Sequence, residues 1–271
     1  MKLSVIVSIY KRPGALALVL ASLARQTRAP DEVIVTEDGR AAENAAVVAE
    51  FQSRFQSLRH LTQDDIGNRK PLALNKAILA SNGDYLVFVD GDCVLRADFV
   101  AAHAAFKEEA AFLTGRRVEL SAKATARLTL ARVERGYLDG HPWWLYWDAL
   151  RGRSQSLGRF FRTPGPLRKL LRQDEILDIR GCNFSVHRAP IVAINGFSNN
   201  FSGAYGEDSD VEYRLKFHGL RMKSVKGAAI QFHLWHATQA KDLGNQSRLQ
   251  ELLVKGAARA ENGLNEAASI A

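Results

Sequence analysis

Two carboxylates separated by a glycine, Asp90-Gly91-Asp92, directly follow a run of five apolar residues. The run, 85–89, is too short for a helix, and its β-branched and aromatic residues are typical of a buried strand. Alternation along a strand would place residues 90 and 92 on the same side, where their oxygens could bind one hard cation. The pattern therefore predicts a divalent-cation site at the end of a strand, with a solvated Asp-Gly turn as the alternative.

Strand and helix patterns alternate along the first third of the chain and would position this site. Strands are predicted over 3–9, 32–36, 58–62 and 85–89, and helices over 13–27, 41–56 and 71–81. Such alternation is typical of a parallel sheet with right-handed crossovers. The polar sets Tyr10-Lys11-Arg12, Glu37-Asp38 and Asp90-Gly91-Asp92 follow three of these strands. We therefore expect them at one edge of the sheet, where open α/β sheets bind ligands.

The second half of the chain is less regular. Helices are predicted over 97–110 and 122–138, a strand over 112–119, ordered segments over 176–187, 203–219 and 229–236, and a helical tail from residue 246. Three of the four tryptophans are Trp143, Trp144 and Trp147, just before a segment, 151–172, with seven basic residues and no acid. We expect this stretch, about 140–175, to be an insertion.

Composition bounds the class of protein. With 46% apolar and 24% charged residues among 271, the chain can bury a full core. No apolar run is long enough for a membrane span, and Met1 leads directly into a strand pattern, so we expect a cytoplasmic protein. Cys93 and Cys182 lack the spacing of a metal or redox motif and are predicted to be buried. Segment 151–172 supplies seven of the eight net positive charges, so the basicity is local and does not indicate nucleic-acid binding.

Four motifs, taken in order, make the sequence resemble the family 2 inverting glycosyltransferases with a GT-A fold. They are Ser8 to Pro13 after the first strand, Glu37-Asp38-Gly39 after the second, Ala73-Leu74-Asn75, and Asp90-Gly91-Asp92. Two later segments, Gly206 to Asp210 and His233 to His236, are similar to the carboxy-terminal region of galactosyl- and N-acetylgalactosaminyltransferases. The resemblance covers roughly 3–115 and 178–240 and leaves the aromatic and basic middle unexplained.

The resemblance implies an α/β fold in which a Rossmann-like, mostly parallel central sheet is flanked by helices, with a carboxy-terminal extension on the acceptor side. It further implies a nucleotide-sugar-binding half over 1–120, an acceptor-binding and catalytic half over 121–245, and a helical tail over 246–271. The implied reaction is metal-dependent, inverting transfer of a hexose or N-acetylhexosamine from a UDP-sugar to a glycan or glycolipid acceptor.

The implied donor leaves as a diphosphate, so its developing charge calls for Mn²⁺ or Mg²⁺ held by few protein ligands. Asp92 and Asp90 are the expected carboxylate ligands. His236 and His233 are expected to complete the coordination, because imidazole also suits manganese. The alternative for either histidine is a place in the core or on the surface.

Inverting transfer also needs a general base that takes the proton of the acceptor hydroxyl. Asp208 is the predicted base, and Glu207 is predicted to hold an acceptor hydroxyl. Both lie at the start of a helical pattern, as does Asp210, and acidic residues are favoured at helix N-termini for capping. Capping is therefore the alternative role, and the favoured one for Asp210.

Donor contacts are assigned from the predicted strand ends, and acceptor contacts from the aromatic residues of the middle segment. Asp38 is expected to accept the imide N–H of uracil, with Glu37 as the alternative. Further donor contacts are expected at Ser8, Tyr10, Arg12, Arg69, Lys70, Asn75, Asp90 and Gly91. Trp143 and Trp144 are expected to stack on an acceptor sugar, although a membrane interface or the core would also suit them. Segment 151–172 is predicted to contact an anionic membrane peripherally, with a solvated charged face as the alternative.

Other functions make different demands on the sequence. A sugar-phosphate nucleotidyltransferase would share the sheet and the metal-binding acids, but its first strand is expected to lead into a glycine-rich loop, and Ser8 to Pro13 contains no glycine. A nucleic-acid-binding module would need a helix-turn-helix, zinc or aromatic-strand signature, and the sequence shows none of these. A non-catalytic sugar-binding protein would have lost an acid from Asp90, Asp92 or Asp208, and all three are present. We therefore predict a glycosyltransferase.

Overall fold

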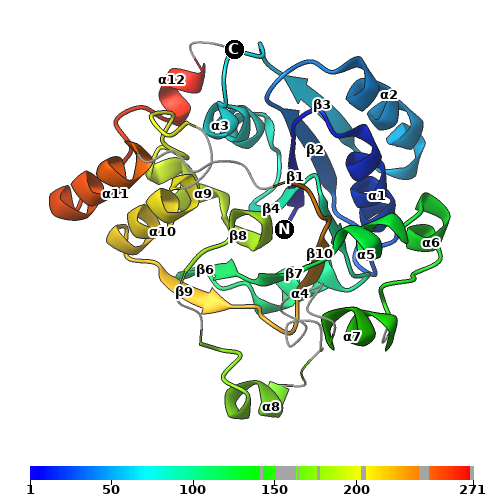
Figure 1. The fold of residues 1–271 in the computed structure, drawn as a ribbon. Coiled ribbons are helices and arrows are strands. Elements are labelled where there is room, and N and C mark those ends of the chain that lie inside the picture. Colours follow the sequence, from blue (N-terminus) through cyan, green and yellow to red (C-terminus); the bar gives the residue numbers. More distant parts are fainter. Residues whose placement is uncertain are drawn as a thin grey trace.

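A seven-stranded sheet forms the centre of the computed structural model, which describes residues 1–140, 143–150, 163, 165–175, 178–202, 206–237 and 244–268. The strands are β1 (Leu3–Ile9), β2 (Glu32–Glu37), β3 (Leu58–Thr62), β4 (Tyr85–Asp90), β6 (Ala111–Thr114), β8 (Phe184–His187) and β9 (Arg221–Ser224). Their order is β3-β2-β1-β4-β8-β6-β9 (Figure 1). The first four are parallel to one another, whereas β8 is antiparallel to both its neighbours, β4 and β6. The sheet is therefore mostly parallel, as predicted.

A smaller sheet continues from two strands of the large one. It contains β5 (Cys93–Leu95), β10 (Ile230–His233) and β7 (Arg116–Glu119), with β10 in the middle. β10 is antiparallel to β5 and parallel to β7. Because β5 follows β4 after one turn, this sheet brings the carboxy-terminal strand β10 to the end of β4 (Figure 1).

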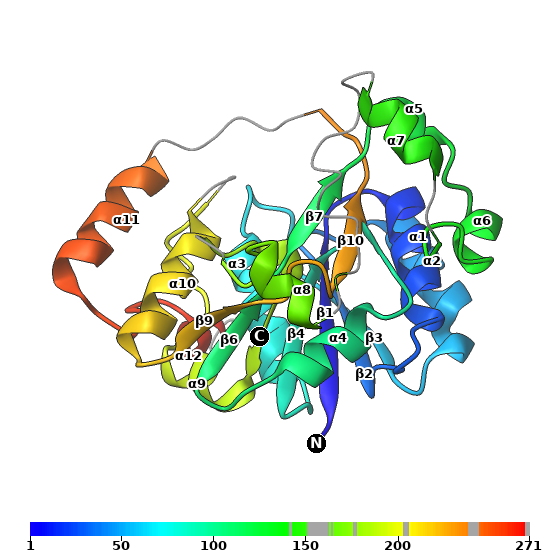
Figure 2. The same cartoon turned by 90° about the horizontal axis from the view of Figure 1, so that it is seen from below.

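Helices cover both faces of the large sheet (Figure 2). Helices α1 (Pro13–Ala24), α2 (Ala42–Phe51) and α4 (Phe99–Phe106) share one core with Val5 and Val33. Helices α3 (Lys70–Ala80), α9 (Arg188–Ala193), α10 (Glu207–Phe217) and α12 (Leu264–Ala268) share a second core with Ile6 and Ile34. Successive strand residues point to opposite faces, so a continuous apolar run supplies both cores.

Shorter helices and turns complete the fold. They are the 3-10 turns η1 (Gln52–Arg54) and η3 (Gly181–Asn183), and the helices α5 (Ala122–Ala126), α6 (Leu130–Glu134), α7 (Trp143–Leu150), α8 (Gly165–Leu170) and α11 (Gly244–Lys255). None of the described helices is long and apolar enough to cross a membrane. Of the predicted insertion, residues 141–142, 151–162 and 164 lie outside the described part of the chain. The insertion and the division of the chain into two halves and a tail stay predictions.

Two predicted elements are divided in the structure. The strand predicted over 112–119 becomes β6 and β7, which belong to different sheets. At Gly115, between them, a Cβ would lie 2.4 Å from Asn183, and the Gly115 N–H donates to the Asn183 carbonyl at 2.8 Å. The helix predicted over 122–138 becomes α5 and α6, and the hydroxyls of Ser121 and Thr129 cap their separate starts. Both predictions were wrong because the spacing of apolar residues shows neither where two backbones approach closely nor where a second helix N-cap begins a new helix.

Candidate active site

A cavity of about 640 Å³ opens at the carboxyl ends of β1, β2 and β4. Most residues predicted to bind a donor line it, namely Ser8, Tyr10, Arg12, Asp38, Lys70, Asp90 and Gly91, and Asp92 and His236 line it as well. They come together because parallel strands end at one edge of the sheet. The register pairs Ser8 of β1 with Asp90 of β4.

Asp90 ends β4 and accepts hydrogen bonds from two sides. The Ser8 hydroxyl and Lys70 Nζ, the latter at the start of α3, each donate to Asp90 Oδ1 at 2.9 Å. Burial alone would raise the pKa of Asp90, but the charge and hydrogen bond of Lys70 outweigh it, so the pKa is lowered. Asp90 is therefore an anion whose described partners are a hydroxyl and an ammonium group.

Asp92 lies in the turn after β4 and not on the strand itself. The turn is tight because a Cβ on Gly91 would lie 2.6 Å from Ile9 Cδ1. The backbone N–H of Leu234 donates to the Asp92 carbonyl at 2.9 Å, which ties the turn to the end of β10. The expectation that strand alternation positions both carboxylates was therefore wrong, because β4 ends at Asp90.

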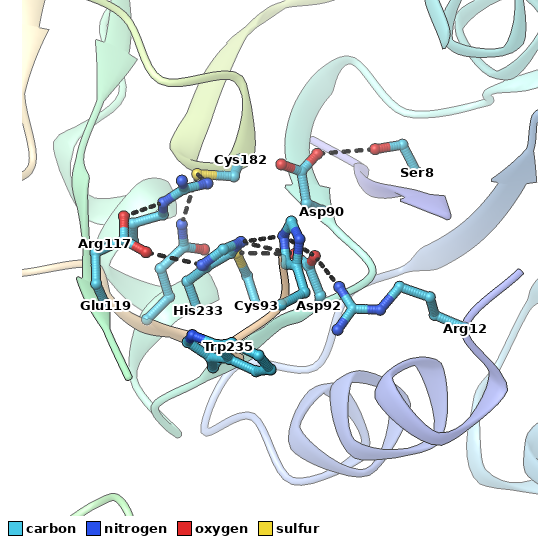
Figure 3. Close-up of polar contacts among 12 residues, drawn as sticks. Ser8, Arg12, Asp90, Asp92, Cys93, Arg117, Glu119, Cys182, His233 and Trp235 are labelled. Carbon is cyan, nitrogen blue, oxygen red and sulfur yellow. Dashed lines mark hydrogen bonds and ion pairs between the residues drawn. The ribbon is translucent and has the colours of Figure 1, made fainter. Parts of the chain in front are cut away.

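Asp92, His233 and His236 converge beside this turn. Figure 3 shows Asp92 and His233 side by side. Their ligand atoms all lie within 4.8 Å of one another. His236 Nε2 is 3.4 Å from Asp92 Oδ2 and 3.2 Å from His233 Nε2, and His233 Nε2 is 3.6 Å from Asp92 Oδ1. Arg12 Nη1 contacts Asp92 Oδ2 at 2.7 Å from the cavity side. Three of the four predicted metal ligands thus form one cluster, and Asp90 pairs with Lys70 instead.

Both imidazoles, when neutral, turn an unprotonated nitrogen toward this cluster. His233 Nδ1 lies 2.8 Å from Glu119 Oε2, and His236 Nδ1 lies 2.8 Å from the Ala237 carbonyl oxygen. A carboxylate and a carbonyl can only accept, so each Nδ1 carries the hydrogen and each Nε2 has a lone pair. Two lone pairs and a carboxylate repel one another at this range unless positive charge lies among them. The donor set therefore fits a divalent transition-metal ion.

Glu37 and Asp38, adjacent at the end of β2, make contacts in different places. Asp38 lines the cavity, and its carboxylate accepts from Gln63 Nε2 at 2.7 Å and from the backbone N–H of Arg69. Glu37 is fully buried and accepts from Asn44 Nδ2, on α2, at 2.8 Å. Of the two candidates for the donor base, Asp38 is the one that the fold places in the cavity wall.

Glu207 and Asp208 begin α10 close to Lys70. The residue before them, Gly206, has a φ of 104°, a conformation that favours glycine. Lys70 Nζ, while bonded to Asp90, lies 3.8 Å from Glu207 Oε1. Asp208 Oδ2 accepts the backbone N–H of Gly181 at 2.9 Å, and no hydrogen-bond donor among the described residues reaches its buried Oδ1.

The two carboxyls at the start of α10 both have raised pKa values. Burial, followed by the charge of Asp208, raises the pKa of Glu207 to about 7, although Lys70 opposes the shift. Burial is also the largest cause for Asp208, whose pKa is raised although Lys70 lowers it. Such shifts are frequent in catalytic carboxyls, and a carboxylate with one unused oxygen is suited to accept a proton.

Two other polar residues predicted near the site have structural contacts. Asp210 is fully buried, and its Oδ1 forms an ion pair with Arg214 Nη2 at 2.9 Å within α10. Asn75 is also fully buried; its Nδ2 donates to the Phe197 carbonyl at 2.8 Å, and its Oδ1 accepts the Phe197 N–H at 2.9 Å. Asn75 therefore joins α3 to the segment that precedes α10, and it does not line the cavity in which a donor contact was predicted for it.

The aromatic residues predicted to bind an acceptor lie on α7. Trp144 is partly buried and stacks on Tyr137, with ring centroids 5.5 Å apart, whereas Trp143 is 72% exposed. Of segment 151–172, only Thr163 and residues from Gly165 onward are described, so the predicted membrane contact lies largely outside the described residues.

Sequence reasoning missed two neighbours of the cluster, Glu119 and Arg117. Glu119 contacts His233, and Arg117 Nε donates to Glu119 Oε1 at 2.7 Å. Burial would raise the pKa of Glu119, but the hydrogen bonds from His233 and Arg117 lower it to about 2. The available signal was a short, mostly charged strand, Arg116-Arg117-Val118-Glu119, in which one residue is apolar. Cys93 and Cys182 are buried free thiols, as predicted.

Comparison with protein families gives two matches. The model of glycosyl transferase family 2 matches residues 4–192, and a model described as the N-terminal domain of galactosyltransferase matches residues 167–237. The chain is 27% identical over 248 residues to validoxylamine A glucosyltransferase of Streptomyces hygroscopicus subsp. limoneus, with 81% of this chain and 49% of the relative covered. It is 25% identical over 236 residues to chondroitin synthase of Escherichia coli, with 83% and 34% covered. The chain thus spans about half the length of the first relative and a third of the second.

Solved structures share the fold at low identity. TarS of Staphylococcus aureus has a TM-score of 0.64 and 16% identity, covering 100% of this chain and 42% of TarS. A structure of GalNAc-T7 with UDP, GalNAc and Mn²⁺ also has a TM-score of 0.64, at 12% identity, covering 93% of this chain and 48% of that one. These likenesses confirm the predicted α/β fold of the GT-A type.

Proposed function

Because the chain belongs to glycosyltransferase family 2 and has a galactosyltransferase-like carboxy-terminal region, we propose that it transfers a hexose or N-acetylhexosamine from a UDP-sugar. The acceptor is a glycan or glycolipid, and the reaction is a direct displacement with inversion at the anomeric carbon. Membership in this family decides against the nucleotidyltransferase interpretation.

The observation that carries this proposal is the position of Lys70 between the strand-end cavity and a partly buried pair of carboxyls, Glu207 and Asp208. Lys70 lines the cavity, donates to Asp90 and contacts Glu207, which is adjacent to the predicted base Asp208. A donor in the cavity would thereby have its anomeric carbon near a carboxylate that can deprotonate an acceptor. In this proposal Asp208 takes the proton of the attacking hydroxyl, and Glu207 orients that hydroxyl.

The donor site in this proposal is the cavity at the ends of β1, β2 and β4. Asp38 accepts the uracil imide N–H, and Arg12 and Lys70 provide positive charge for the phosphates and the sugar. Two fold neighbours support the choice of donor, since a structure of TarS 1–349 is a complex with UDP-GlcNAc and the GalNAc-T7 structure contains UDP.

Of the two expected ions, Mn²⁺ and Mg²⁺, the proposed cofactor is Mn²⁺, held by Asp92, His233 and His236, because imidazole suits manganese whereas magnesium prefers oxygen ligands. When bound, the ion supplies positive charge that stabilises the departing diphosphate. The chain's own part is to keep these three side chains converged, which it does through the turn at Gly91 and the neighbouring strand β10. Mn²⁺ in the structures of GalNAc-T7 and of the mannosyltransferase PcManGT from Pyrobaculum calidifontis supports the choice of ion.

The proposed acceptor contacts are Glu207 and the aromatic residues of α7. Trp143 has most of its indole surface exposed and can stack on the apolar face of a sugar ring. Trp144 has less free surface because it already stacks on Tyr137.

The test of the proposed function is nucleotide binding. With Mn²⁺, UDP is expected to raise the Tm of the parent protein more than GDP does, because a ligand that binds the folded state stabilises it. Asp38→Ala is expected to lose this preference for UDP, since the carboxylate that accepts the uracil imide proton is gone. Asp64→Ala, which removes an exposed acid paired with Arg40, is the control. Equal affinities of Asp38→Ala and the parent for UDP in calorimetry would refute the assignment.

Peripheral membrane contact is a separate part of the proposal. The sequence of segment 151–172 carries seven basic residues and no acid, and three leucines in and just after α8, Leu167, Leu170 and Leu171, are exposed. We expect the protein to cosediment with anionic liposomes, and the bound fraction to fall as salt rises, because charges are screened within about 10 Å at 0.1 M salt. Arg168 is buried and donates to the Ser224 carbonyl at 2.9 Å, so it is left in place. Replacing the other six basic residues should abolish binding, whereas replacing the exposed Arg40 and Lys255 should not. Binding insensitive both to salt and to the sixfold replacement would contradict the proposed membrane contact.

A further inference from the structure

Glu119 ends β7 directly opposite His233 on β10. The parallel register pairs the two residues, so their side chains leave the small sheet on the same side. Glu119 Oε2 lies 2.8 Å from His233 Nδ1, and Figure 3 shows the two side chains pointing toward each other. His233 therefore faces Glu119 with one ring nitrogen and Asp92 with the other.

Arg117 binds the carboxylate oxygen of Glu119 that does not contact His233. Arg117 Nε donates to Oε1 at 2.7 Å, so the two oxygens of Glu119 serve two different partners. Arg117 Nη1 also reaches Cys182 Sγ at 3.8 Å, and Gln231 Nε2 donates to the same sulfur at 3.1 Å. This chain of contacts anchors Arg117 against buried groups, so the carboxylate cannot turn away from His233 without breaking the Arg117 bond.

We propose that Glu119 is a positioning residue for the cation site, which holds His233 as the Nδ1–H tautomer and directs its Nε2 lone pair toward Asp92 and His236. The inference rests on the proposed role of His233 as a metal ligand. A carboxylate behind a ligating imidazole fixes the orientation of the ring and raises the basicity of its other nitrogen. Among the described residues, the partner of His236 in the equivalent position is a neutral backbone carbonyl, so His233 receives the stronger electrostatic support.

The first measurement is the affinity of the nucleotide-free protein for Mn²⁺ alone. Binding is monitored by the loss of the electron paramagnetic resonance signal of the free ion. Glu119→Gln keeps the shape of the side chain but removes its charge, and Glu119→Ala removes the acceptor altogether. We expect Mn²⁺ binding to weaken by about 10- to 100-fold, the usual effect of losing such a supporting group, with alanine at least as severe as glutamine.

The matched control is Glu108→Gln. Glu108 is as exposed as Glu119 and forms ion pairs with Arg221 and Lys223 at the other end of β6, away from the cluster. We expect this variant to lose those ion pairs and to bind Mn²⁺ as tightly as the parent. A comparable loss of affinity in Glu108→Gln and Glu119→Gln would mean that Glu119 acts only through general stability, which overturns the proposal.

The second measurement needs no metal and separates this inference from the proposed function. Nitrogen-15 NMR of the metal-free parent should show His233 protonated at Nδ1, with its signals assigned from their loss in His233→Asn. In Glu119→Ala this preference should disappear. If the parent binds no Mn²⁺, the proposed cofactor is wrong, and the NMR result alone then decides whether Glu119 sets the tautomer. An unchanged His233 tautomer in Glu119→Ala, or unchanged Mn²⁺ affinity, would overturn the inference.

Discussion

Asp208→Asn is expected to lower kcat and kcat/KM together, by roughly 10² to 10⁴-fold, while UDP binding changes little. The carboxylate lies at the start of α10, where its Oδ2 accepts the Gly181 N–H and its buried Oδ1 has no donor among the described residues. That free oxygen is the atom proposed to receive the acceptor proton. A base acts only as the proton moves, so its loss leaves donor binding intact and appears in turnover.

Asparagine is the informative substitution because it keeps the shape and capping ability of aspartate without its basicity. Glu207→Gln and Asp210→Asn serve as matched controls, since all three acids lie in the first turn of α10. We expect Glu207→Gln to weaken acceptor use and Asp210→Asn to act mainly on stability, because Asp210 pairs with Arg214. If Asp208→Asn transfers sugar at nearly the parental rate while one of the others does not, the base lies elsewhere in the cluster.

The pH dependence of the same rates gives a second check on Asp208. Because burial raises its pKa, the acid limb of kcat/KM should lie above the range of an ordinary aspartate, about 3.9. The base works only when ionised, so activity falls as pH falls through the pKa of the folded protein. Lys70 lowers the pKa of Asp208, and Lys70→Met should therefore move the acid limb to higher pH. An acid limb that does not respond to Lys70→Met would argue against Asp208 as the titrating base.

Asp92→Ala is expected to abolish the divalent-ion dependence of UDP binding together with turnover. Asp92 is the anionic member of the cluster that also contains His233 and His236, and without it two neutral imidazoles would face a dication alone. The measurement is UDP titration by calorimetry, with and without Mn²⁺, alongside a manganese-dependent transfer assay. Unchanged manganese-dependent turnover in Asp92→Ala would contradict the assignment of the metal site.

Asp90→Asn is the matched control for Asp92→Ala. Asp90 receives hydrogen bonds from Ser8 and Lys70 and lies outside the three-residue cluster. We therefore expect Asp90→Asn to retain more Mn²⁺ affinity than Asp92→Ala, with its main effect on the charge balance around Lys70. The reverse order of Mn²⁺ affinities would identify Asp90 as the principal ligand.

The order of strands and helices in the first third of the chain could be predicted from the sequence alone. Apolar runs between 3 and 90 match β1 to β4, and the polar residues that follow three of them, Tyr10 to Arg12, Asp38 and Asp90, do meet at one cavity. The reason is that periodicity and strand-end position are local properties, and parallel strands must end at a common edge.

The arrangement of the carboxy-terminal groups could not be predicted in the same way. His233 and His236 reach Asp92 because β10 pairs with β5 and β7, strands from a different part of the chain. Glu119 reaches His233 through the same pairing, and its sequence context is only that of a charged strand end.

Local pattern thus determined the element types in the first third of the chain and the sheet edge that carries the candidate site, but it misjudged how Asp92 is positioned. Tertiary structure alone decided that Asp90 pairs with Lys70 and Asp208 with the Gly181 backbone, and that Asp38 rather than Glu37 lines the cavity. The physical reason is that hydrophobic spacing records which face of an element is buried. It does not record which distant element covers that face, because that depends on how both cores pack around the completed sheet.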